Sequence, residues 1–259
     1  MIKSFLQELK LRNRELYYFG WFNLLGALVC MVMSQVSDTM VLGISAWIKP
    51  AKFFLSTTAF VWTIAWLLHY LNEPRKLSIY NKVVIIVLLF ENSYISIRAA
   101  NGEMSHFNSS SAFNTTMFQL MAMAIGLITV WTGYFTWLFF KRSFPQLKRH
   151  YLWGIRFGLL FFILFAMSGY IMLVFMGHTV GGRDGGTGLP FVNWSGHYGD
   201  LRVAHFMGMH SLQLLPLMGY YISKRSIITV LLSLVYFLLV AAVLLQALIK
   251  KPLIEFYLG

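Results

Sequence analysis

Long apolar runs separated by short polar segments dominate the pattern of this chain. Each run is about as long as a helix that crosses the hydrocarbon core of a bilayer. The expected spans are roughly 17–37, 53–71, 83–100, 116–140, 151–177, 201–222 and 227–249. Because the gaps are short, the pattern predicts an all-α bundle of seven transmembrane helices, with residues 1–259 forming one membrane domain.

Residues 1–16 precede the first span and predict a helix that lies in the membrane interface. Phe5 and Leu9 share one side of this helix, whereas Lys3 and Lys10 lie on another side. No small-residue cleavage pattern follows the first apolar run, so that run is interpreted as a retained span. Residues 250–259 are expected to form a short tail.

Composition and charge agree with a membrane protein. Apolar residues make up 58% of the chain and charged residues only 12%. The net charge of +12 is spread over separate loops, which argues against nucleic acid as a partner and favours contact with anionic lipid headgroups. The positive-inside rule predicts an inside N-terminus and an outside C-terminus. The cations expected inside are Lys3, Lys10, Arg12, Arg14, Arg75, Lys76, Lys82, Lys141, Arg142, Lys148, Arg149, Lys224 and Arg225.

The sixth expected span is unusually polar for a transmembrane helix. It contains Arg202, His205, His210 and Gln213, and Asp200 stands at its entrance. At about 100° per residue these four side chains fall within an arc of roughly 140°. Ionisable groups inside a span indicate a functional site, because each is costly unless it is paired or faces a cavity.

The third expected span has a second polar stripe, formed by Glu91, Tyr94 and Arg98 at i, i+3 and i+7. Glu91 lies about 13 Å below the outer end of its helix, and His210 lies a similar depth of about 15 Å below Asp200. Spans three and six therefore predict an outward-facing polar pocket between them. The alternative is a set of buried ion pairs that only fix helix register.

Two outer loops add polar residues to the same layer. The loop after span three contains Ser105, His106 and Asn108, and the loop after span five has a glycine-rich run over 181–188. This run favours a re-entrant or lid-like loop, with an anion cradle as the alternative. The second loop also brings His178, Arg183, Asp184, Asn193, Trp194 and His197.

Trp47, Lys49, Pro50 and Lys52 stand at the entrance to span two. Proline suits the first turn of a helix, and an aromatic residue with two lysines suits a membrane boundary. The pattern favours an anchor over direct ligand contact.

Several phrases together resemble an uncharacterised family of bacterial multi-spanning membrane proteins. They are WIKPAKF at 47–53, SHFN at 105–108, DGGTGLP at 184–190, WS at 194–195 and GDLRVAHFMGMHSLQLLPL at 199–217. The resemblance covers most of the chain. It implies a multi-pass protein of the bacterial inner membrane and implies no activity.

The histidines and acids of the outer layer predict chemistry at the pocket. Zinc or non-haem iron would suit a nitrogen and oxygen ligand set chosen from His106, His205, Asp200, His178 and His197. Glu91 would be the catalytic proton acceptor and His210 would hold it. Arg98, Arg202, Trp194, Asn108 and Gln213 are the expected substrate-binding residues.

This pattern predicts a membrane enzyme that acts on a lipid or small amphiphile, with other classes left open. Haem against His205 or His210 is less favoured, because no second intramembrane histidine lies at matching depth. Proton or solute transport and a non-catalytic lipid or ligand sensor are the further alternatives. The sequence leaves the substrate, the reaction, the cofactor and the oligomeric state undetermined.

Overall fold

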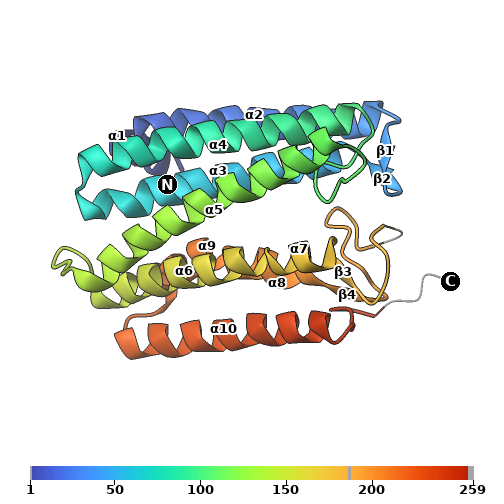
Figure 1. Ribbon diagram of the computed structural model, residues 1–259. Coiled ribbons are helices and arrows are strands. Elements are labelled where there is room, and N and C mark those ends of the chain that lie inside the picture. Colours follow the sequence, from blue (N-terminus) through green and yellow to red (C-terminus); the bar gives the residue numbers. More distant parts are fainter. Residues whose placement is uncertain (1, 186–187, 256–259) are drawn as a thin grey trace. The chain divides into compact units, whose positions relative to one another are not determined.

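The computed structural model describes residues 2–185 and 188–255, and it is built almost entirely of helices (Figure 1). The chain divides into two compact units, Met1–Trp131 and Thr132–Gly259. Gly186 and Thr187, which belong to the predicted glycine-rich loop, and residues 256–259 of the predicted tail lie outside the described residues. Each unit is described by itself below.

The first unit consists of antiparallel helices joined by short connections. Its elements are α1 (Ile2–Arg12), α2 (Arg14–Val36), β1 (Met40–Val41), β2 (Ile44–Ser45), α3 (Ile48–Leu68), the 3₁₀ helix η1 (His69–Leu71), α4 (Pro74–Ala100) and the first part of α5 (Ala112–Lys141). The two short strands pair in an antiparallel hairpin between α2 and α3.

The helix expected over 1–16 is found as α1, which ends at Arg12 and is fixed to the end of α3; its place in the membrane interface remains a prediction. Leu9 is fully buried, and the ring of Phe5 stacks on that of Trp66 with centroids 5.0 Å apart. The guanidinium of Arg12 lies 4.0 Å from the Trp66 ring centroid. It also donates a hydrogen bond to the backbone carbonyl of Trp66 at 3.1 Å. Asn13 then begins α2 by accepting a hydrogen bond from the Leu16 backbone N–H.

A buried network of amides and hydroxyls joins α2, α3 and α4. The Asn92 side-chain amide donates to Asn23 Oδ1 at 2.8 Å and lies 3.1 Å from Thr57 Oγ1. The amide of Asn23 in turn donates to the carbonyl of Phe19 at 2.7 Å. Interhelical hydrogen bonds of this kind stabilise helix pairs in a bilayer. Lipid tails are as apolar as the helix side chains, so the hydrophobic effect does not drive the helices together there.

The second unit is built around α6 and the helical pieces that pack on it. Its elements are the end of α5, α6 (Arg149–Ser168), α7 (Ile171–Phe175), β3 (Thr179–Val180), β4 (Gly199–Asp200), α8 (Leu201–Met209), α9 (Ser211–Leu217), the π-helix η2 (Met218–Ile222) and α10 (Ser226–Leu248). Strands β3 and β4 pair in an antiparallel manner, which closes the long loop between α7 and α8.

Two glycines of α6 let α9 approach closely. A Cβ added to Gly158 would lie 2.9 Å from the backbone oxygen of Ser211, and one added to Gly154 would meet the backbone of Leu215. The Ser211 hydroxyl uses this short separation to donate to the carbonyl of Gly158 at 3.0 Å. Small residues four apart are typical of closely packed helices in membranes.

Six helical segments of the described chain are long and apolar enough to cross a membrane, so the chain is a multi-span helical membrane protein. They are Arg14–Val36, Ile48–Leu71, Pro74–Ala100, Ala112–Lys141, Arg149–Phe175 and Ser226–Leu248. The sixth predicted span, 201–222, instead comprises α8, α9 and η2, none of which has spanning length alone. The helical hydrogen bonds pass through His210, whose N–H donates to Phe206 O and whose carbonyl accepts from Leu214 N. The total of seven spans and the orientation remain predictions.

Candidate functional site: a buried carboxyl at the end of α4

Glu91, Tyr94 and Arg98 share one stripe of α4, as their spacing predicts, and all three are buried. Their exposed fractions are 5%, 6% and 8%. Tyr94 belongs to an apolar cluster with Ile95 and Met121. The helix therefore points a carboxyl, a phenol and a guanidinium into the protein rather than toward lipid.

His106 links this stripe to the loop after α4. Its Nε2 lies 3.8 Å from Glu91 Oε1, while its Nδ1 lies 3.3 Å from Lys49 Nζ and 3.1 Å from Ser105 Oγ. The His106 side chain is 22% exposed and that of Glu91 only 7%. His106 thus stands between the surface and a carboxyl that has almost no access to water.

The contacts at Nδ1 decide which nitrogen of the neutral His106 ring has the proton. The ammonium of Lys49 can only donate a hydrogen bond, so Nδ1 accepts. The ring proton then lies on Nε2, which faces the carboxyl of Glu91. This order places the Nε2–H next to the buried carboxyl and the ammonium of Lys49 on the other side of the ring.

Three polar atoms on the α4 stripe are buried without a hydrogen-bond partner among the described residues. They are Glu91 Oε2, Tyr94 Oη and Arg98 Nε. The Nη2 of Arg98 forms an ion pair with Glu103, which neutralises its charge. Buried polar groups in native proteins are nearly always satisfied, so unpartnered atoms gathered on one stripe indicate a bound molecule, water or a transferable proton.

Aromatic rings enclose the His106 side of the site. The imidazole centroid lies 5.6 Å from that of Phe53, 6.3 Å from that of Phe107 and 5.8 Å from that of Phe118. These rings exclude water and lower the local dielectric constant, which strengthens the interaction between charged groups. They also keep the imidazole oriented between Lys49 and Glu91.

The second unit also contains a buried carboxylate, Asp200, but its hydrogen-bonding capacity is filled. Oδ1 accepts from the backbone and Nε of Arg202 at 3.0 and 2.9 Å. Oδ2 accepts from Ser195 N at 3.0 Å and from a terminal nitrogen of Arg202 at 2.5 Å, and the same nitrogen donates to the carbonyl of Asn193. Asp200 and Arg202 thus form an ion pair.

Asp184 closes the glycine-rich loop in a similar way. Its carboxylate accepts from the backbone N–H groups of His178 and Thr179 at 3.1 and 2.9 Å, and the His178 Nδ1 lies 3.0 Å away. Burial alone would raise the pKa of the Asp184 carboxyl, but the hydrogen bonds and charge from His178 outweigh it and hold that pKa well below its usual range. Gly181 reverses the loop with a φ of +100°.

Two histidines predicted as metal ligands in the second unit have other side-chain partners. His205 Nδ1 lies 2.8 Å from the carbonyl of Phe165, to which it donates, and His178 Nδ1 lies 3.0 Å from Asp184 Oδ1. The backbone N–H of His197 donates to Ser195 Oγ at 3.3 Å, a bond that does not involve its imidazole. Within residues 2–185 and 188–255, no three His, Cys, Asp or Glu residues are grouped so that they could hold a metal ion. The prediction of a zinc or iron centre therefore gains no support from the structure.

The other predicted site residues are divided between the two units. His210 Nδ1 lies 3.2 Å from Gln213 Oε1, and the Trp194 ring packs against Phe206 at a centroid distance of 5.6 Å. Asn108 bonds within its own loop, to Met104 O and to Ser110. Because Glu91 belongs to the first unit and His210 to the second, the pocket between spans three and six stays a prediction.

Lys49 is the site residue whose role sequence reasoning underrated. Its position in the Trp-Ile-Lys-Pro segment favoured a membrane anchor, whereas its Nζ approaches His106 from the first turn of α3. The usable signal was the expected start of a helix at Pro50, which places residue 49 at the same membrane boundary as the loop containing His106.

Comparison with family models, with curated proteins and with solved structures gives no match for this chain. The resemblance to a bacterial membrane-protein family therefore remains a prediction.

Proposed function

We propose that this membrane protein exchanges a proton between the outer aqueous side and Glu91, through His106, as part of binding a small polar or amphiphilic ligand. The observation that supports the proposal most directly is the buried Glu91 carboxyl. It faces the partly exposed His106 ring at 3.8 Å, and its second oxygen has no hydrogen-bond partner in the described part of the chain. Intramembrane carboxyls of this kind are typical of proton-exchange sites.

The geometry supports two charge states of the pair. With Glu91 neutral, the carboxyl is tolerated in an apolar environment and His106 carries its proton on Nε2. With Glu91 ionised, a protonated His106 would supply the opposing charge; its Nδ1–H would then donate to Ser105 Oγ, and the hydrogen bond from Lys49 would be lost. Lys49 adds a fixed positive charge on the side of the imidazole away from Glu91, which opposes a second proton on the ring and favours transfer of a ring proton toward Glu91.

The ligand would occupy the unpartnered side of the stripe. Tyr94 Oη and Arg98 Nε provide two hydrogen-bond donors, and Glu91 Oε2 provides an acceptor when ionised or a donor when protonated. A molecule with oxygen acceptors next to an exchangeable proton would satisfy all three atoms. This is the chemistry of a small amphiphile or a polar headgroup that enters from the outer leaflet.

Infrared difference spectroscopy on the reconstituted protein tests the proposal. A pH step should produce a carbonyl band of a buried carboxylic acid that disappears in Glu91→Gln. Glu73→Gln is the matched control, because Glu73 stands at the opposite end of α4 with an ion pair to Lys76. His106→Gln should slow the appearance of the band. A band that persists in Glu91→Gln would overturn the assignment.

Proteoliposomes with a trapped pH dye separate the remaining alternatives. Net proton movement across the bilayer that Glu91→Gln abolishes would assign the site to transport. Reversible titration without net movement would assign it to a closed pocket, as in a receptor or an enzyme, in which Glu91 acts as a general base.

A further inference from the structure

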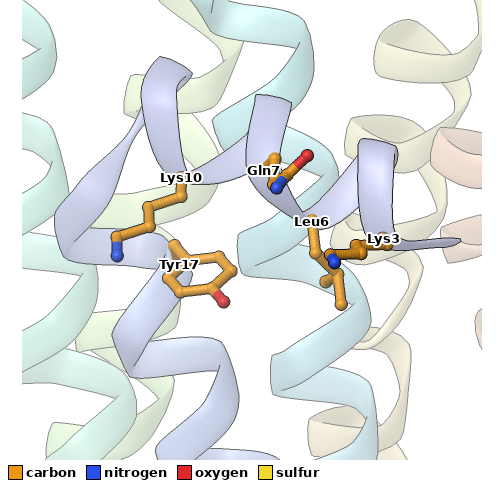
Figure 2. A pocket seen from close by; sticks show the side chains of 5 residues that line it. All are labelled: Lys3, Leu6, Gln7, Lys10 and Tyr17. Atoms are coloured by element: carbon orange, nitrogen blue, oxygen red, sulfur yellow. The ribbon is translucent and has the colours of Figure 1, made fainter.

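A hollow of about 570 Å³ lies between α1 and the start of α2, far along the chain from the Glu91 site. It is lined by Lys3, Leu6, Gln7, Lys10 and Tyr17 (Figure 2). Lys3, Gln7 and Lys10 follow one another at i, i+4 and i+7 on α1, so they occupy one face of this helix. Two ammonium groups and an amide therefore border the same space.

The hollow is preformed, because the opposite face of α1 is fixed to the protein. Leu9 is fully buried, and Arg12 is held by the ring and carbonyl of Trp66. The lysine face of α1 cannot rotate inward without breaking these contacts. A ligand that binds there does not have to order the helix first.

The acidic residues near the hollow are engaged elsewhere. Glu8 pairs with Arg12 at 2.8 Å, and Glu15 accepts from the amide of Asn81 at 3.3 Å. Neither Lys3 nor Lys10 forms an ion pair with a carboxylate of the described chain. The hollow is therefore positively charged and would attract an anion.

An apolar track on α2 continues from the hollow. Tyr17, Trp21 and Leu28 lie on one stripe at i, i+4 and i+11, and the rings of Tyr17 and Trp21 are 6.4 Å apart. Trp21 is 40% exposed and Leu28 is 54% exposed, on a helix of spanning length. A ligand with a charged head at Lys10 and a long apolar tail would match both parts of this surface.

We propose that the hollow binds an anionic phospholipid, with its phosphate between Lys3 and Lys10 and an acyl chain along Trp21 and Leu28 of α2. The site is independent of the proton-exchange function. Tyr17 and Gln7 supply hydrogen-bond donors for the phosphate oxygens. On the predicted orientation, the hollow faces the inner leaflet, where basic residues beside a span are drawn to anionic lipids.

Native mass spectrometry of the detergent-purified full chain tests this site. The double variant Lys3→Gln/Lys10→Gln should weaken retention of phosphatidylglycerol about twenty-fivefold, because each lysine near an anionic headgroup contributes roughly a factor of five. Binding of phosphatidylcholine should change little. Lys3→Arg/Lys10→Arg should retain the binding, which separates loss of charge from a loss of folding.

The matched control is Lys148→Gln/Lys224→Gln, which removes the same charge from exposed positions on the same predicted side of the membrane. An equal loss in both double variants would overturn the proposal in favour of a diffuse charge effect. Inorganic phosphate that displaces the lipid at equal concentration would overturn it in favour of a soluble anion. Loss of binding in the arginine variant would also contradict it.

Discussion

Glu91 in the first unit and Asp200 in the second are both buried carboxyl groups, yet their surroundings differ sharply. Asp200 accepts from two backbone N–H groups and from the guanidinium of Arg202, so both of its oxygens are satisfied. Among residues 2–185 and 188–255, Glu91 Oε1 lies 3.8 Å from His106 Nε2, and Oε2 has no hydrogen-bond partner. The first arrangement stabilises a loop, whereas the second leaves the carboxyl able to change its protonation state or its partner.

The same contrast separates Glu91 from its neighbour Asn92. Asn92 is 2% exposed and donates to both Asn23 and Thr57, which ties three helices together. Consecutive residues of one helix point about 100° apart, so one turn of α4 presents a structural amide on one side and an unsatisfied carboxyl on the other. Burial of a polar group therefore does not reveal its role; the partners do.

The largest effect on stability is expected for Asp200→Ala. The substitution removes the acceptor for two backbone N–H groups and leaves Arg202 without its carboxylate. We expect the free energy of unfolding to fall by about 3 kcal/mol. This value is at the lower end of the range for breaking a buried ion pair, because the Arg202 side chain is 25% exposed. Thermal unfolding in detergent measures it, with the exposed Asp38→Ala as control. A loss no larger than that of the control would show that Asp200 has no structural role.

A smaller loss is expected for Asn92→Leu. The leucine fills the space of the amide but leaves Asn23 Oδ1 buried without its donor. The free energy of unfolding, measured by the same thermal unfolding assay, should fall by about 1–2 kcal/mol. Ser96→Ala removes only a bond from Ser96 to the carbonyl of Asn92 on the same helix, and it should cost much less. Equal losses in the two variants would contradict a structural role of the interhelical network.

Acid should loosen the loop that Asp184 closes. Because the pKa of this carboxyl is lower in the folded protein than in the unfolded chain, its contribution is complete above about pH 4 and is lost as the pH falls toward the folded value. The ionised Asp184 carboxylate contributes on the order of 1 kcal/mol to the stability of the closed loop. Hydrogen exchange at 177–185, corrected for the intrinsic rate, should rise as the pH falls below 4. In Asp184→Asn this additional rise should disappear.

The smallest effect on stability is expected for Glu91→Gln. Its Oε2 has no hydrogen-bond partner among the residues that the structure describes, and the 3.8 Å approach of Oε1 to His106 is longer than a hydrogen bond. The free energy of unfolding should change by less than about 0.5 kcal/mol. A loss above 2 kcal/mol would mean that Glu91 is a structural residue like Asp200, and the comparison between the two would fail.

Hydropathy located the membrane helices well, because spanning length and apolar composition are local properties of the chain. The first expected span, 17–37, corresponds to Arg14–Val36, and the last, 227–249, to Ser226–Leu248. The 201–222 segment has the expected helical content, but its division at His210 and the π-helix from Met218 were not predicted. These depend on close packing against α6 and on Pro216, which has no N–H to continue the regular ladder.

The candidate site was predicted only in part, for a different physical reason. The stripe of Glu91, Tyr94 and Arg98 follows from helix periodicity, and a polar loop at the same boundary identified His106. The partner of each polar group does not follow from periodicity: Asp200 and His205 have the residue types of metal ligands but bond to backbone groups and Arg202. Only coordinates distinguish satisfied groups from unsatisfied ones.

The corner at Asn13 has a consequence for how the first unit responds to its bilayer. One residue separates α1 from α2, with Arg12 held by Trp66 before it and Tyr17 O accepting from Trp62 after it. A membrane that becomes thinner or thicker cannot be accommodated by sliding α1 alone. The helices α1, α2 and α3 must tilt together, so hydrophobic mismatch should act on these three helices as one rigid piece.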